Sequence, residues 1–141
     1  MQKEVTILLV EDDEVDALAI ERAFRHLRIA NPLAHAKDGL EALEHLRGTN
    51  GREPISRPFI VLLDLNMPRM NGIEFLEEVR ADKALRDTVV FVLTTSKADE
   101  DKVKAYRLNV AGYIVKESVG DDFLDCLHML AHYWRVIEFP K

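Results

Sequence analysis

Cysteine is nearly absent from this 141-residue sequence, which contains only Cys126. A chain with one cysteine cannot form an internal disulfide, and a single cysteine in a predicted helix is interpreted as a small buried apolar side chain. Long apolar runs are absent too, since none approaches the roughly 20 residues of a membrane-spanning helix. The N-terminus lacks the longer apolar segment of a signal peptide. These absences predict a cytoplasmic protein with no membrane partner.

Positive charge is in the minority. Asp and Glu number 25 against 19 Lys and Arg, and neither sign forms a long block. An acidic chain is repelled by phosphate backbones, so direct binding of nucleic acid is disfavoured. Repeats, low-complexity tracts and linkers are lacking, while 48% of the residues are hydrophobic, which is enough for a packed core. The length predicts a single domain over residues 1–141, with 131–141 as the end of the last helix and a tail.

What the sequence does contain is a short apolar run followed by a helical pattern, five times over. Short apolar runs bounded by polar turns are typical of strands buried on both faces. The runs are Val5–Val10, Leu33–Ala36, Phe59–Leu63, Val89–Leu93 and Gly112–Val115. The helices are marked by Leu18, Ile20, Phe24 and Leu27; by Leu40, Leu43 and Leu46; by Ile73, Phe75, Leu76 and Val79; by Val103, Tyr106 and Val110; and by Phe123, Leu127, Leu130, Trp134 and Ile137. Strict alternation predicts an α/β fold, with a doubly wound, five-stranded parallel sheet between layers of five helices.

Polar side chains stand at the ends of four of the predicted strands. In a doubly wound sheet the carboxyl ends of the strands meet at one edge, where ligands bind. Taken singly, each residue has an ordinary explanation as a solvated turn, a surface charge or a helix cap, and Asp13 in particular is expected to cap the first helix. Their coincidence at one edge of a single sheet is what predicts a site. The residues are Glu11, Asp12 and Asp13; Asp64; Thr94, Thr95 and Ser96; and Lys116.

The chemistry of these groups favours phosphoryl transfer. Crowded carboxylates repel one another unless a cation lies between them, and oxygen ligands select a hard ion such as Mg²⁺. A carboxylate can act as the nucleophile and become an acyl phosphate. Asp64 is the candidate because it ends an internal strand. Thr94 could donate a hydrogen bond to the phosphoryl oxygens, and Lys116 supplies a second positive charge.

Four stretches, ILLVEDD, LLDLNMPRMNG, VLTTS and GYIVK, together resemble the receiver domains of response regulators, in that family's order and at similar spacing, from Val5 to about Leu130. The resemblance implies a flavodoxin-like three-layer sandwich. It also implies a stand-alone response regulator of a two-component phosphorelay, which accepts a phosphoryl group on Asp64 from a phospho-histidine and signals through a protein interface. Such a protein is not an enzyme in the usual sense, although it catalyses its own Mg²⁺-dependent phosphorylation and dephosphorylation.

The resemblance also assigns roles to individual residues. The metal site would consist of Glu11, acting through water, Asp12, Asp64 and the main-chain carbonyl of Asn66. Thr94 and Tyr113 would form the switch, Lys116 would lie near the phosphoryl group, and Asn66 and Ser96 would tune dephosphorylation. Met67, Pro68 and Gly72 would shape the loop behind the nucleophile.

The sequence departs from the family pattern in three places. Three acids follow Val10, so the acidic pair could also be Asp12 and Asp13; alignment with the motif favours Glu11 and Asp12. Glu117 follows Lys116 where many receivers have proline, which leaves the geometry of that bond open. Residues 48–58 form a longer loop than usual. Together with the Lys116-Glu117-Ser118 sequence and the aromatic tail, this loop resembles a subgroup that is paired with bacterial phytochromes.

The last predicted helix has more apolar residues than one buried face needs. Some of them could simply be half exposed, but an interface is favoured. We therefore expect a homodimer through this helix and its tail. The other partner would be a sensor histidine kinase, for which the subgroup suggests a bacteriophytochrome, or a phosphotransfer protein. The interface residues would be Cys126, Met129, Tyr133, Trp134, Val136 and Phe139.

Two other functions share parts of this pattern. An aspartate-nucleophile phosphohydrolase also uses a strand-end Asp and Mg²⁺, but it usually has a second Asp two positions on, where this chain has Asn66, and a cap domain. A receiver-like module that no longer takes phosphate is disfavoured by the intact set of site residues. The histidines receive no role: His128 and His132 lack the glutamate of a zinc-protease motif, and His26, His35 and His45 have no companions in the sequence.

Overall fold

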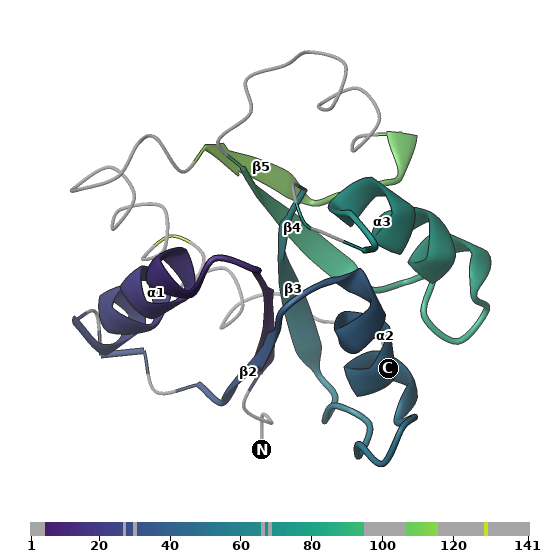
Figure 1. Cartoon of the computed structure of the whole chain (residues 1–141), viewed down its shortest axis with the longest axis horizontal. Coiled ribbons are helices and arrows are strands. Elements are labelled where there is room, and N and C mark those ends of the chain that lie inside the picture. The colour runs from purple at the N-terminus through teal and green to yellow at the C-terminus, as the bar shows by residue number, and fades with distance from the viewer. Residues whose placement is uncertain are drawn as a thin grey trace.

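A computed structural model of the chain describes residues 5–26, 28–29, 31–65, 67, 69–94, 107–115 and 129. Five parallel strands form one sheet in the order β2-β1-β3-β4-β5, as Figure 1 shows. Each predicted apolar run corresponds to one observed strand, and the predicted and observed ends differ by at most one residue. The strands are β1 (Thr6–Val10), β2 (Leu33–Ala36), β3 (Phe59–Asp64), β4 (Val89–Thr94) and β5 (Gly112–Val115).

Three of the five predicted helices lie within the described residues. They are α1 (Glu14–His26), α2 (Gly39–Arg47) and α3 (Gly72–Ala81). Helix α1 covers one face of the sheet, whereas α2 and α3 cover the other (Figure 1). Alternate residues along each strand therefore enter two separate cores: Leu9 packs on the α1 side, and Val10 on the side of α2 and α3. None of the described helices is long and apolar enough to cross a membrane.

The apolar pattern of the helices needs three corrections. Leu18 is 47% exposed and Leu40 is 42% exposed. On α1 the buried positions are Ala17, Ile20, Ala23 and Phe24, and Leu18 lies about 200° around the helix from Ile20, because each residue turns the helix by about 100°. Leu40 lies in the first turn of α2, beside rather than on the stripe of Leu43 and Leu46. Val110 is buried, but it lies outside a helix, just before β5.

The long loop between α2 and β3 folds back onto α2. Gly48 ends the helix in the left-handed conformation (φ 69°), and its amide donates to the carbonyl of Glu44 at 2.8 Å. Further along, Arg52 forms an ion pair with Glu44 at 3.4 Å, and the amide of Ile55 donates to the carbonyl of His45 at 2.9 Å. The described loop is therefore held on the side of the sheet where α2 packs.

The strand order determines where a site can form. From β1 the chain crosses to β2 on one side, and β3 then lies on the other side of β1. Neighbouring strands whose connections leave in opposite directions open a crevice at their carboxyl ends. For this strand order the rule places the crevice between the ends of β1 and β3, where the sequence has Glu11, Asp12 and Asp64.

Candidate metal and phosphorylation site

Three carboxylates from two neighbouring strands come together at this crevice. Val10 pairs with Leu63, so the next residues, Glu11 after the end of β1 and Asp64 at the end of β3, lie side by side. One carboxylate oxygen each from Glu11, Asp12 and Asp64 lie within 4.8 Å of one another. The structure thus groups the three acidic side chains that were expected to hold the metal.

The burial of this cluster is uneven. Glu11 is fully buried and Asp64 is 5% exposed, whereas Asp12 is exposed to solvent. Carboxylates this close together repel one another, and a cation held between them offsets their negative charge. Oxygen-only donors with one side open to solvent fit a hard divalent cation that keeps some of its waters. The residues present therefore fit a metal ion.

Asp13 has a different task from its two acidic neighbours. Its Oδ1 accepts hydrogen bonds from the amides of Val15 at 2.8 Å and Asp16 at 3.2 Å. Its main-chain carbonyl accepts from Ala17 at 2.9 Å, as expected of the residue that caps α1. The predicted cap is confirmed. This carboxylate is engaged with the helix, and the two acidic side chains that lie beside Asp64 are Glu11 and Asp12.

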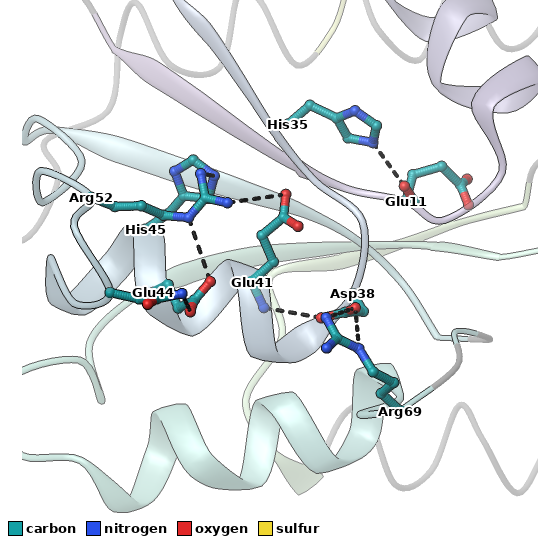
Figure 2. A network of polar contacts seen from close by, with 9 residues as sticks. Glu11, His35, Asp38, Glu41, Glu44, His45, Arg52 and Arg69 are labelled. Atoms are coloured by element: carbon teal, nitrogen blue, oxygen red, sulfur yellow. Dashed lines mark hydrogen bonds and ion pairs between the residues drawn. The ribbon is translucent and has the colours of Figure 1, made fainter.

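The main chain of Glu11 is held by β2. Its amide donates to the carbonyl of Ala36 at 3.0 Å, and its carbonyl oxygen lies 2.7 Å from Nε2 of His35 (Figure 2). A carbonyl only accepts hydrogen bonds, so the Nε2 nitrogen carries the proton and donates it. Sequence reasoning assigned His35 no role. No local signal could have found it, since the contact depends on how β1 and β2 are aligned.

The loop after Asp64 is shaped by a close approach of α3. Gly72 opens this helix, and its amide donates to the carbonyl of Leu65 at 3.0 Å. A Cβ atom at Gly72 would lie 2.7 Å from the carbonyl oxygen of Asp64 and 2.7 Å from the Cα of Leu65. Only glycine fits here without moving the backbone of the candidate nucleophile. Met67, in the same loop, is buried.

This loop is also tied to the start of α2. Asp38 caps that helix by accepting from the amide of Glu41 at 3.0 Å, and its other oxygen accepts from Nε of Arg69 at 2.8 Å (Figure 2). Burial raises the pKa of the Asp38 carboxyl, but the hydrogen bond from Glu41 and the ion pair with Arg69 outweigh it, so the pKa is lowered below 3.8. Asp38 is therefore an anion at neutral pH and links two loops beside the crevice.

Several expected site residues are described only in part. The main chain of Thr94 ends β4 and pairs with Val115, while Asp64 pairs with Leu93, so residue 94 reaches the same edge of the sheet. The side chains of Thr94 and Tyr113 lie outside the described structure. So do all of Asn66, Ser96 and Lys116, and the last helix except for Met129, which is 72% exposed.

Comparisons with known proteins agree with this geometry. A family model of the response regulator receiver domain matches residues 7–128. The probable methanogenesis regulatory protein FilR2 of Methanothrix harundinacea is 38% identical over 128 residues, which cover 91% of this chain and 82% of FilR2. Response regulator Rcp1 of Synechocystis is 33% identical over 128 residues, which cover 91% of this chain and 87% of Rcp1.

Solved structures show the same likeness. The phosphorylated cyanobacterial phytochrome response regulator RcpA has a TM-score of 0.87 at 31% identity, covering 99% of this chain and 100% of that one. The Mn²⁺-bound form of Rcp1 has a TM-score of 0.85 at 31% identity, covering 97% and 99%. The chain belongs to the response regulator receiver domain family, and it acts in a two-component phosphorelay with a histidine kinase or phosphotransfer protein as its partner.

Proposed function

We propose that Asp64 is the residue that accepts the phosphoryl group. The observation that carries this proposal is the position of its carboxylate: it ends an internal strand and lies beside Glu11 and Asp12, with one oxygen of each within 4.8 Å. Only 5% of Asp64 is exposed. A nucleophile in such a place is shielded from most solvent but can be reached from the open side at Asp12.

The transfer is a displacement at phosphorus. An Oδ of Asp64 attacks, the bond from phosphorus to the partner's histidine nitrogen breaks, and an acyl phosphate forms while the imidazole leaves. Hydrolysis returns the protein to its unphosphorylated state: water attacks the phosphorus, inorganic phosphate leaves, and the Asp64 carboxylate is regenerated. The same site would accept a phosphoryl group from a small donor such as acetyl phosphate, so the chain would catalyse its own phosphorylation and dephosphorylation.

The cation in this proposal is Mg²⁺. Asp12, Asp64 and the carbonyl of Asn66 would be its direct protein ligands, with Glu11 acting through water. When bound, the ion offsets the negative charge that gathers between carboxylate and phosphoryl oxygens. Support comes from the oxygen-only cluster of this chain and from the Mn²⁺-bound form of the relative Rcp1.

The response to phosphorylation would begin at the neighbouring strand ends. Thr94 would donate to a phosphoryl oxygen, Lys116 would pair with its negative charge, and Tyr113 would turn inward as Thr94 moves. Asn66 and Ser96 would set the rate at which water reaches the phosphorus. The main chain of Thr94 ends the strand next to Asp64, in agreement with this proposal.

The proposed signalling partners are a bacteriophytochrome kinase and a second copy of the chain. The first rests on the likeness to RcpA, a cyanobacterial phytochrome response regulator whose solved structure is of the phosphorylated form. The second rests on the apolar excess of the last helix and on the 72% exposure of Met129 within it. We expect a dimer in light scattering at micromolar concentration, weakened in Met129→Glu; a monomeric wild type would contradict this interface.

Intact-mass spectrometry with acetyl phosphate and Mg²⁺ tests the phosphoacceptor. The wild type should gain one phosphoryl group per chain, and Asp64→Asn should gain none, because an amide oxygen is a poor nucleophile. Asp13→Asn is the matched control: asparagine also caps helices well, so this variant should keep both its fold and its labelling. Labelling of Asp64→Asn to the wild-type extent would place the phosphoryl group elsewhere and refute the proposal.

A further inference from the structure

The carbonyl oxygen of Glu11 marks the point where the main chain leaves the sheet. The regular pairing of β1 with β2 ends at Val10 and Ala36, and the amide of Glu11 makes one further bond, 3.0 Å to the carbonyl of Ala36. In a continued parallel ladder, the carbonyl of Glu11 would accept from the amide of residue 38. Asp38 is instead the N-cap of α2, with its backbone already turned toward that helix.

A side chain occupies the place of that ladder bond. The ring of His35 reaches along β2, and its Nε2 lies 2.7 Å from the Glu11 carbonyl oxygen, as the close-up in Figure 2 shows. His35 pairs with Leu9 across the two strands, so its side chain lies on the same face as Leu9 and, two residues on, Glu11. The ring is half-buried, which reduces competition from water for this hydrogen bond.

We propose that His35 is a positioning residue of the metal site. It touches neither metal nor phosphoryl group, but it fixes the peptide plane after Glu11 and so the direction in which the next residue, Asp12, leaves the sheet. The inference rests on the proposed function, because it concerns the ligands of the metal site named there. Partners that orient the groups around a metal typically change its affinity by about 10–100-fold when they are removed.

Two substitutions of His35, by glutamine and by asparagine, can distinguish the roles of its two ring nitrogens. A glutamine side chain can bring its amide N–H close to the position of the imidazole Nε2, whereas the shorter asparagine reaches only the position of Nδ1. His35→Gln can therefore keep the bond to the Glu11 carbonyl, and His35→Asn cannot. Both residues are neutral and polar, so a difference between the variants reports on this hydrogen bond rather than on charge.

The experiment measures Mn²⁺ affinity, with electron paramagnetic resonance counting the free ion. His35→Asn should bind Mn²⁺ about tenfold more weakly than the wild type, and His35→Gln should bind within about threefold of it. His26→Asn is the matched control, because His26 is exposed in the last turn of α1, about 18 Å along that helix from its start. It should bind as the wild type does.

Each outcome has one meaning. If His35→Asn binds like the wild type, or if both substitutions weaken binding equally, His35 does not position the site through Nε2 and the inference is wrong. Such a result leaves the proposed function intact as long as Asp12→Asn still abolishes binding. If the wild type itself does not bind Mn²⁺, both the inference about His35 and the proposed metal site are wrong. Thermal unfolding of each variant, followed by circular dichroism, verifies that the compared proteins are folded at the titration temperature.

Discussion

The three adjacent carboxylates at the end of β1 have two different roles. Glu11 and Asp12 turn toward Asp64, while Asp13 caps α1. The division follows from geometry: the first two residues leave the sheet beside β3, and the third stands where the helix begins and its free amides need an acceptor. The same type of side chain therefore contributes to a charged cluster or to a helix end according to its position.

Gly72 provides a test of how closely the nucleophile is positioned. A methyl group in Gly72→Ala would meet the backbone of Asp64 and Leu65 at 2.7 Å, so the backbone must move. We expect the free energy of unfolding to fall by about 1–3 kcal/mol and acetyl phosphate labelling to slow at least about tenfold. Denaturant unfolding and labelling kinetics measure the two effects.

Gly51→Ala controls for stability alone. Gly51 has a φ of 79° but nothing within 4 Å of an added Cβ, and it lies in the loop after α2. This substitution should lower stability through backbone strain and leave the labelling rate unchanged. If Gly72→Ala labels as fast as Gly51→Ala, the close approach to Asp64 does not position the nucleophile.

At the scale of elements, one arginine joins α3 to the starts of β4 and β5. Nε of Arg80 donates to the carbonyl of Leu108 at 2.6 Å, and Nη2 donates to Asn109 at 3.1 Å. Nη1 donates to the carbonyls of Arg86 at 2.7 Å and Thr88 at 2.8 Å. These contacts lie at the end of the sheet opposite the acidic cluster. Burial lowers the pKa of the Arg80 guanidinium, and Asp87 opposes this.

Replacing this arginine should cost stability without affecting the site. In Arg80→Met four carbonyls lose a charged donor, so we expect the free energy of unfolding to fall by about 2–4 kcal/mol. Mn²⁺ affinity at a temperature where the protein is folded should not change. Arg86→Met, which alters an exposed side chain, should stay within about 0.5 kcal/mol of the wild type in urea unfolding. Equal stability of the two variants would contradict the role of Arg80.

At the scale of the whole molecule, stability should depend on pH through His45. Burial lowers the pKa of His45 below 6.5, and the positive charge of Arg52 lowers it further, partly opposed by Glu41. The unfolded chain then binds more protons than the folded one. The stabilisation is complete above the unfolded pKa and is lost as the pH falls below it, toward the folded pKa.

Removing the titrating ring should remove this pH dependence. Urea unfolding at about pH 7.5 and about pH 5.5 should show a smaller loss of stability on acidification in His45→Gln than in the wild type. His26→Gln, at an exposed position on α1, should retain the wild-type difference. An unchanged pH difference in His45→Gln would mean that His45 does not determine it.

The arrangement of the elements was largely predictable from sequence because its signals are local. Apolar runs of strand length, such as Phe59–Leu63, lie within one residue of the strands observed. The buried faces of the helices were predicted less well: Leu18 is apolar yet exposed, because it lies on the side of α1 opposite the buried stripe. The predicted cap at Asp13 rests on local chain geometry, and the structure confirms it. The place of Gly72 behind the nucleophile was implied by the family resemblance, and in the structure Gly72 approaches the backbone of Asp64 and Leu65 closely.

By itself, the sequence determined the alternation of strands and helices and the residues at which strands end. The spacing of apolar side chains and the residue types of turns depend only on residues close together in the sequence, so both can be recognised from the sequence alone. Only the tertiary structure decided that the carboxylates of Glu11 and Asp12 lie beside that of Asp64, while Asp13 caps α1, and that His35 holds the carbonyl of Glu11. The contacts with Asp64 and His35 join residues 24 to 53 positions apart, and they depend on strand register, which the packing of the whole sheet sets.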